Sequence, residues 1–268
     1  MTNMKLMTYN LLNGGENGID KVIAVIESES PDFLTINEAN TFADNDFKIL
    51  KEIAKCGNFI NYKLALSGEY DYHVAIFSKF PWKSVEEIKP VDRACLLVEF
   101  DTSIGKLSIG GLHLTPYTED KRLPEIDLIT KAQSKYKNKI LMGDMNSLSE
   151  TDNYSPNIIK GFNEMQLKKF TTRGVFRFDA MKRILASGYV DPAVIFLKNE
   201  IYTAPTSINE YGAHTNMRLD YILVSPSLVA NISNYNVVRN NLTEAGSDHY
   251  PVTLEMNDIE MLQHPRSG

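Results

Sequence analysis

The sequence predicts an α/β protein built as a four-layer α/β/β/α sandwich, in which two packed, mostly antiparallel sheets are flanked by helices. Short apolar runs of strand length alternate with segments of helical periodicity along most of the chain. Four strand-like runs follow one another closely between residues 62 and 114, which is typical of antiparallel pairing. Because the remaining strands are interspersed with helical segments, we expect helices to cover the outer faces of both sheets.

The elements of the first half follow from this patterning. A helix is expected where isoleucine and valine recur at helical spacing, and Pro31 ends it. In chain order the prediction is a strand at 4–12, a helix at 19–26, a strand at 33–36, a helix at 45–55, and strands at 62–66, 73–78, 94–100 and 106–114.

The second half is predicted in the same way. A helix is expected within 119–136, where Pro124 should limit the position at which it begins. A second is expected to end at Gly188, which suits a helix C-cap. The other expected elements are a strand at 139–146, helices at 156–165 and 178–187, and strands at 218–225 and 249–256.

Length and composition narrow the class of protein. The chain has 268 residues, of which 43% are hydrophobic and 23% charged, enough for one large core. No repeat, low-complexity tract or long linker divides it, so we expect one domain over 1–256 and a weakly patterned tail over 257–268. It has neither a membrane-length apolar run nor a signal peptide, which predicts a cytoplasmic monomer without stable membrane association.

Charge and cysteine content exclude some functions. The net charge of −6 argues against a protein that coats nucleic acid through bulk positive potential, although a local patch can still bind phosphate. Cys56 and Cys95 are the only cysteines, and neither lies in a spacing typical of zinc or redox sites. A disulfide framework is not expected.

Carboxylate, amide and imidazole side chains lie in or just after the apolar strands. Such groups cost a few kcal/mol each when they are buried without partners. They therefore either satisfy one another in a network or form a site. They are Asn10, Glu38, His113, Asp144, Asn146, Asp220, Asp248 and His249.

Hydrolysis of a phosphate ester requires this mixture of groups. Carboxylate and amide oxygens suit Mg²⁺ or Mn²⁺, while imidazoles and further carboxylates activate water and stabilise the charge of the transition state. Asp144 and Asn146 are two residues apart and share one face if the strand continues. Asp248 and His249 are adjacent, so in an extended segment they diverge and can serve different partners.

Six short motifs carry a resemblance to a known family. In order they are TYN (8–10), NE (37–38), LHL (112–114), GDMNS (143–147), RLDYILVS (218–225) and SDHYPV (247–252). Together they resemble the endonuclease/exonuclease/phosphatase superfamily, which includes DNase I, AP endonucleases, neutral sphingomyelinases, deadenylases and inositol-phosphate 5-phosphatases. The resemblance covers about 240 residues and implies that 1–256 form the catalytic domain.

The resemblance implies a metal side of the site. Glu38 would be the principal ligand of Mg²⁺ or Mn²⁺, with Asn10 at or beside the metal. Asp248 would be either a second carboxylate on this side or the partner that orients His249.

It also implies a side that activates water. His249 would be the general base or the group paired with the attacking water, and Asp144 and Asn146 would position the water and the phosphoryl oxygens. His113 would donate to a non-bridging oxygen, and Asp220 would orient His113. Arg93, Tyr117 and Arg122 are weaker candidates for substrate contacts.

Each of these residues has an ordinary structural interpretation when taken alone. Asn10 can be a turn residue, Glu38 a solvated strand end, His113 a satisfied sheet histidine and Asp144 a turn former or helix cap. The order of the whole set favours the functional interpretation. Residues 247–249 also contain the side chains of a Ser-His-Asp hydrolase, but a catalytic triad is spatial and the sequence contains no GxSxG elbow.

Departures from subfamily patterns bear on the substrate. AP endonucleases of the exonuclease III type usually carry Trp before the RLDY-like motif and Asp two residues after the first Asn, where this chain has Met217 and Leu12. The Trp that precedes the GDxN motif of inositol 5-phosphatases is also missing. Basic residues alternate with Phe170, Phe176 and Phe178 between 168 and 183, which suggests either a nucleic-acid surface or a solvated helix face.

The sequence therefore predicts a Mg²⁺- or Mn²⁺-dependent phosphodiesterase, and in particular a nuclease acting on DNA or RNA. One alternative is a phosphomonoesterase or a lipid-head-group phosphodiesterase of the sphingomyelinase kind. Another is an inactive binding module, against which the complete set of polar residues argues. The residue types of the site do not distinguish DNA, RNA, phospholipid and inositol phosphate as substrates.

Overall fold

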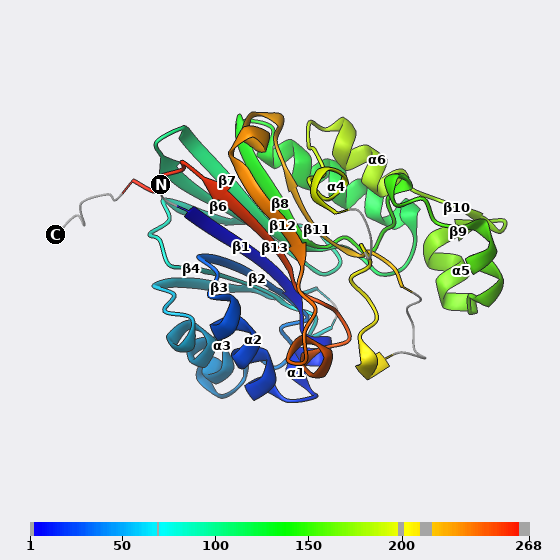
Figure 1. The fold of residues 1–268 in the computed structure, drawn as a ribbon, viewed down its shortest axis with the longest axis horizontal. Helices are drawn as coiled ribbons and strands as arrows, with labels where there is room; N and C mark the ends of the chain where they lie inside the picture. The colour runs from blue at the N-terminus through cyan, green and yellow to red at the C-terminus, as the bar shows by residue number, and fades with distance from the viewer. Residues whose placement is uncertain (1–2, 69, 198–200, 210–215, 263–268) are drawn as a thin grey trace.

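The computed structural model describes residues 3–68, 70–197, 201–209 and 216–262. Its strands form two large sheets (Figure 1). The first sheet has the order β12 (Ile232–Val237), β13 (Val252–Asn257), β1 (Asn3–Asn10), β2 (Phe33–Asn37), β4 (Val74–Ser78), β3 (Asn61–Ala65). The second has the order β11 (Asp220–Val224), β8 (Asn138–Asp144), β7 (Gly105–His113), β6 (Ala94–Thr102), β5 (Ser84–Glu87).

Helices cover the outer face of each sheet, which confirms the predicted four-layer sandwich (Figure 1). On the first sheet lie α2 (Ile19–Glu29) and α3 (Asp44–Cys56), and on the second lie α4 (Glu119–Gln133) and α6 (Asp179–Ala186). Shorter elements are α1 (Leu12–Gly15), α5 (Glu164–Phe170), α7 (Ala193–Phe196), α8 (Thr243–Gly246) and the hairpin β9 (Thr171–Thr172)–β10 (Val175–Phe176).

The alternation of side chains along each strand separates three hydrophobic layers. In β1, Leu6 points into the core between the sheets, whereas its neighbour Met7 packs with the helices α2 and α3. In β8, Ile140 and Leu141 divide in the same way between the central core and the layer under α4 and α6. All four side chains are buried, because both faces of each sheet are covered.

Most of the predicted elements are confirmed, and the differences have local causes. β5 has the sequence SVEE and β12 ISNYNV, so neither carries an apolar run that predicts a strand. Pro124 does not set the start of α4, which begins at Glu119 after the capping hydroxyl of Thr118. Residues 258–262 were expected in a frayed tail, but Ile259 is buried in the central core and Met261 pairs with Thr102.

A small lobe follows β8 and projects from the sandwich (Figure 1). The helix expected over 156–165 is instead a 3-10 helix (Pro156–Gly161) followed by α5, and the helix expected over 178–187 is α6. Gly188 has a φ of 85° just after the C-cap of α6, as predicted. Among the described residues, no helix combines the length and the apolar content that crossing a membrane requires.

Strand direction brings the polar strand ends to one edge of the sandwich. β1 and β2 run parallel and end side by side at Asn10 and Asn37. β7 and β8 also run parallel, with His113 opposite Asp144, and antiparallel β11 begins at Asp220 on the other side of Asp144. The register therefore places His113, Asp144 and Asp220 in one row across the second sheet.

The side chain of Asn37 connects the two sheets at this edge. Its Nδ2 donates to the Leu112 carbonyl at 2.6 Å, and its Oδ1 accepts from the Asp144 backbone amide at 3.1 Å. The side chain is fully buried, so loss of either bond leaves a buried polar group without a partner.

We predict that Asn37→Leu lowers the free energy of unfolding by about 3 kcal/mol, because two buried backbone groups lose their partner. Urea unfolding followed by circular dichroism measures the change. The control is Asn234→Leu, an exposed position in the same sheet, for which we expect a change within about 0.5 kcal/mol. Equal stability of the two variants would contradict a bridging role for Asn37.

Candidate active site

Asp144 lies at the centre of the row of strand ends and is held from several directions. Its Oδ2 accepts from Asn10 Nδ2 at 3.1 Å, and its Oδ1 accepts from the Asn146 backbone amide at 2.7 Å. Gly143 has a φ of 141°, and a Cβ there would lie 1.9 Å from the Leu112 carbonyl oxygen. Only glycine fits this approach of two strands, which sets the direction of the following carboxylate.

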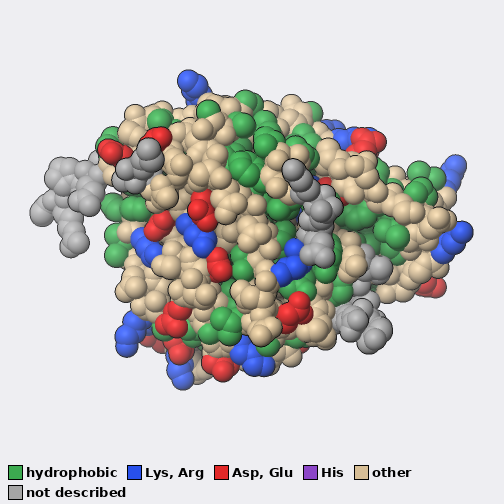
Figure 2. Space-filling view, in the orientation of Figure 1, with side chains coloured by type: hydrophobic (Ala, Val, Ile, Leu, Met, Phe, Trp, Pro, Cys, Tyr) green, Lys and Arg blue, Asp and Glu red, His purple; other side chains and the backbone are tan. Residues whose placement is uncertain are grey.

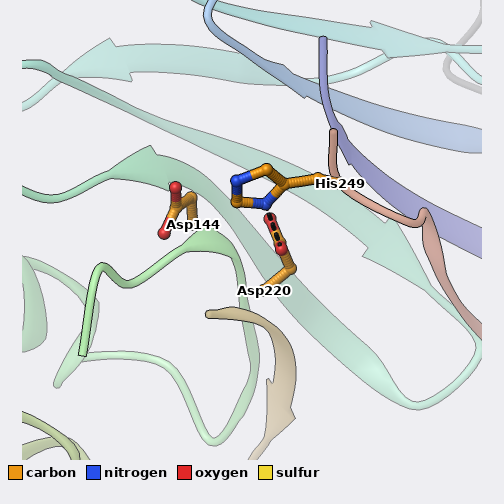
Figure 3. A group of neighbouring side chains, drawn as sticks. All are labelled: Asp144, Asp220 and His249. Atoms are coloured by element: carbon orange, nitrogen blue, oxygen red, sulfur yellow. Dashed lines mark hydrogen bonds and ion pairs between the residues drawn. The ribbon is translucent and has the colours of Figure 1, made fainter. Parts of the chain in front are cut away.

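The structure corrects the predicted partner of Asp220. Asp220 Oδ2 lies 2.7 Å from His249 Nδ1, so this carboxylate orients His249 and not His113 (Figure 3). Thr203 Oγ1 donates to the same oxygen at 2.6 Å, while Asp220 Oδ1 is buried without a hydrogen-bond partner. Asp220 is therefore the carboxylate that contacts His249 Nδ1, and Asp248 stays a predicted metal-side residue.

Two groups of side chains could hold a cation. Asp144, Asp220 and His249 each place one ligand atom within 4.8 Å of the others, and Figure 3 shows Asp144 and Asp220 on two sides of the imidazole ring, with the dashed contact running to Asp220. On the first sheet, Asn10 Nδ2 lies 3.4 Å from Glu38 Oε1, so the predicted metal-side residues Asn10 and Glu38 are also neighbours.

The two groups differ in charge. Burial raises the pKa of the Glu38 carboxyl, against a hydrogen bond from the Asn13 amide and the nearby His249, and the charges of Asp248 and Asp144 raise it further. Excess negative charge around Glu38 favours a cation. In the other group, the pKa of His249 is raised to about 10, so its imidazole is protonated at neutral pH. A protonated imidazole does not bind metal.

The two histidines of the site have opposite protonation. Burial alone would lower the pKa of His249, but the Asp220 carboxylate, with Asp248 and Asp144, raises it to about 10. Burial lowers the pKa of His113 to about 3, although Asp144 acts in the opposite direction. His249 is therefore an imidazolium at neutral pH, while His113 is neutral with its Nε2 3.5 Å from Asp144 Oδ2.

The three weaker candidates for substrate contacts have different environments. Arg93 precedes Ala94, which pairs with His113, and its guanidinium lies 3.6 Å from the centre of the Tyr72 ring with Nε and Nη1 unpartnered. Tyr117 is 41% exposed and follows β7 at the same edge. Arg93 and Tyr117 remain predicted contacts.

Arg122 is not a substrate contact, contrary to the prediction. Its side chain is fully buried, and it donates to the carbonyls of Thr115 and Lys169 at 3.0 and 2.6 Å. It also forms an ion pair with Glu119 at 3.2 Å. The first turns of α4 therefore hold the segments around the site and do not line it.

The alternating basic and aromatic residues build part of the lobe, and Phe176 and Phe178 also line an open pocket with Arg177 and Lys182. Phe170 is fully buried, and Phe176 and Phe178 pack beside it. The basic residues Arg177, Lys182 and Arg183 form ion pairs with Asp120 and Asp179, Glu150 and Asp127 respectively. Basic side chains still project at the lobe end of the molecule (Figure 2).

Sequence reasoning missed several residues of the site. Lys169 was noted only as part of the basic segment, but its Nζ lies 2.5 Å from Asn146 Oδ1 inside the site. Ser247, whose hydroxyl donates to the Asn10 carbonyl at 2.7 Å, lies within the SDHYPV motif and could have been found there. Asn37 lies within the NE motif and could have been found in the same way, whereas Thr203 lies in no pattern that distinguishes it from structural residues.

Comparison with known proteins agrees with this geometry. A family model described as the endonuclease/exonuclease/phosphatase family matches residues 7–249. The chain belongs to the endonuclease/exonuclease/phosphatase family. This is a family of phosphoesterase hydrolases, and the residues matched include every strand end of the candidate site. In sequence, no curated protein matches the chain.

Solved structures show the same fold. The 3′ phosphatase NExo from Neisseria, bound to a product DNA hairpin, is 20% identical with a TM-score of 0.69, over 95% of this chain and 99% of that one. An AP endonuclease from Archaeoglobus fulgidus is 20% identical with a TM-score of 0.70, over 95% and 100%. A family protein from Bacteroides thetaiotaomicron is 17% identical with a TM-score of 0.66, over 100% and 98%.

The opposite protonation of the two histidines can be observed directly. In the metal-free protein at pH 7.5 we expect His249 to be an imidazolium and His113 a neutral ring, since their pKa values are about 10 and about 3. Long-range ¹H–¹⁵N correlation spectra of the imidazoles distinguish the two states. Asp220→Asn should lower the pKa of His249, and a neutral His249 in the wild type would contradict the pairing.

Proposed function

We propose that this protein is a divalent-metal-dependent phosphodiesterase that cleaves nucleic acid by attack of water. The observation that carries the proposal is the buried group of Asp144, Asp220 and His249 at the meeting point of the two sheets. One small volume contains carboxylates that can hold water, a cationic donor for phosphate and further oxygen ligands for a metal. Phosphoester hydrolysis uses each of these groups.

Residues of the second sheet act on water and phosphate. The Asp144 carboxylate, fixed by Asn10 and by the Asn146 amide, accepts a hydrogen bond from the attacking water and orients it. His249 is held through Nδ1 by Asp220, and its other ring nitrogen lies toward Asp144 (Figure 3). As an imidazolium it donates to a phosphoryl oxygen, a role that replaces the general base expected from the sequence.

The carboxylate of Glu38 is the best ligand for the metal. Its oxygens are hard donors, Asn10 is beside it, and the negative charges of Asp248 and Asp144 around it favour a cation. A bound Mg²⁺ or Mn²⁺ neutralises phosphate charge and lowers the pKa of water. The chain supplies the cradle for it, since the Asn13 amide donates to Glu38 Oε2 at 3.0 Å and fixes this side chain.

Nucleic acid is the proposed substrate because of the structural relatives. NExo is described as a 3′ phosphatase bound to product DNA, and another relative is an AP endonuclease. The NExo description also favours a second candidate, a phosphomonoesterase acting at a 3′ end of DNA. Both candidates use the same attack of water and differ in the leaving group.

We predict that the purified protein hydrolyses bis-p-nitrophenyl phosphate and nicked or single-stranded DNA with Mg²⁺ or Mn²⁺, and that EDTA abolishes the activity. Asp144→Asn should lower kcat/KM by about 1,000-fold, since the water loses its orienting carboxylate. Asp20→Asn, at an exposed position of α2, is the control and should retain activity. Activity that persists in EDTA or in Asp144→Asn would contradict the proposal.

The two candidates are separated by end-labelled substrates. DNA hairpins with either a 3′ phosphate or a 3′ hydroxyl report on monoester and diester cleavage respectively. A diesterase shortens the 3′-hydroxyl hairpin, whereas a phosphomonoesterase only removes the phosphate from the other.

A further inference from the structure

Lys169 places a buried ammonium group beside the catalytic carboxylate. It lies one residue before the end of α5, is 8% exposed, and has its Nζ 2.5 Å from Asn146 Oδ1 and 5.0 Å from the centre of the Phe170 ring. An ammonium has three N–H donors. Among the described residues only Asn146 accepts one of them.

Among the described residues, the carboxylates that balance the charge of this ammonium do not contact it directly. Burial lowers the pKa of Lys169 to about 8, and the charges of Asp144, Glu38 and Asp220 counteract part of this effect. Within the described part of the chain, no carboxylate forms a direct ion pair with Nζ. Burying an unpaired ammonium costs several kcal/mol, so this position calls for an anion beyond those that the described residues supply.

Asn146 links the ammonium to the reacting groups. Its side-chain Nδ2 donates to the Leu114 carbonyl at 2.9 Å and its Oδ1 accepts from Lys169, so both ends of the amide are assigned. Its backbone amide donates to Asp144 Oδ1 at 2.7 Å. Asn146 is thus the single residue that connects the Lys169 ammonium to the Asp144 carboxylate, which orients water.

A buried clamp fixes the backbone that carries Lys169. The Arg122 guanidinium donates to the Lys169 carbonyl at 2.6 Å and to the Thr115 carbonyl, two residues after His113. Its partner Glu119 accepts from Ser147 Oγ at 2.6 Å. The same clamp therefore holds the segments that carry His113, Asn146 and Lys169, as pre-organisation of a site requires.

We propose that Lys169 is a catalytic residue whose ammonium donates to a non-bridging oxygen of the scissile phosphate. The group stabilises the negative charge that accumulates on that oxygen as water attacks, and Arg122 is the positioning residue that holds it. The inference rests on the proposed function. It adds to it a phosphate-binding cation supplied by the lobe, from outside the six motifs of the sequence.

Three substitutions of Lys169 distinguish the effect of its charge from the effect of its hydrogen bond to Asn146. Lys169→Met removes both the charge and the donor to Asn146. Lys169→Gln keeps an N–H donor for Asn146 without the charge, and Lys169→Arg keeps the charge. Lys168→Met, at the exposed neighbouring residue, is the matched control. Circular dichroism and thermal unfolding check that each variant folds, and if Lys169→Met does not, the Gln and Arg variants carry the test.

With bis-p-nitrophenyl phosphate and Mg²⁺, we expect Lys169→Met and Lys169→Gln to lower kcat by about 100-fold and to raise KM by no more than about tenfold. Lys169→Arg should recover part of the loss, and Lys168→Met should stay within about twofold of the wild type. Isothermal titration with inorganic phosphate is an independent readout. Lys169→Met should bind phosphate about tenfold more weakly, which corresponds to one charge-assisted hydrogen bond.

The outcomes are distinguishable from failure of the proposed function. An inactive wild type would overturn the phosphodiesterase itself. An active wild type with an inactive Asp144→Asn, but with Lys169→Met within threefold of wild-type activity, would overturn only the role of Lys169. Full activity in Lys169→Gln would also overturn it, because the lysine would then merely position Asn146.

Discussion

One buried amide, that of Asn37, holds the two sheets together at the edge on which the candidate site depends. It donates to a carbonyl of β7 and accepts from the backbone amide of Asp144 at the end of β8. The same contact fixes Asp144 relative to Asn10, which lies beside Asn37 in the first sheet and donates to the Asp144 carboxylate. The site is therefore built across the sandwich, and neither sheet carries it alone.

Burial then divides the site into two sides of opposite charge. Around Glu38, the negative charges of Asp248 and Asp144 add to its own, and among the described residues its oxygens accept hydrogen bonds from the Asn10 side chain and the Asn13 backbone amide. On the other side of the site, His249 is an imidazolium paired with Asp220, and Lys169 adds a second positive group. A divalent cation would neutralise the negative charge on the first side, and a phosphate oxygen would neutralise the positive charge on the second. Binding of both accounts for buried charges that would otherwise only destabilise the fold.

Much of the fold and of the site follows from the sequence, because strand periodicity and polar strand ends are local features. Glu38, Asp144 and His249 could be placed in this way. The pairing of Asp220 with His249 could not, since it depends on how two strands from different sheets approach in space. The burial of Arg122, a predicted substrate contact, could not be foreseen for the same reason, because the packing of the lobe on α4 buries it.

We propose that Glu38 and its neighbours hold a divalent metal beside Asp144, the residue that orients water. Anomalous scattering from crystals soaked in Mn²⁺ locates such an ion without a substrate or an assay. A strong peak bonded to the Glu38 carboxylate is expected. The absence of any peak at that carboxylate, at Mn²⁺ concentrations that support hydrolysis, would contradict it.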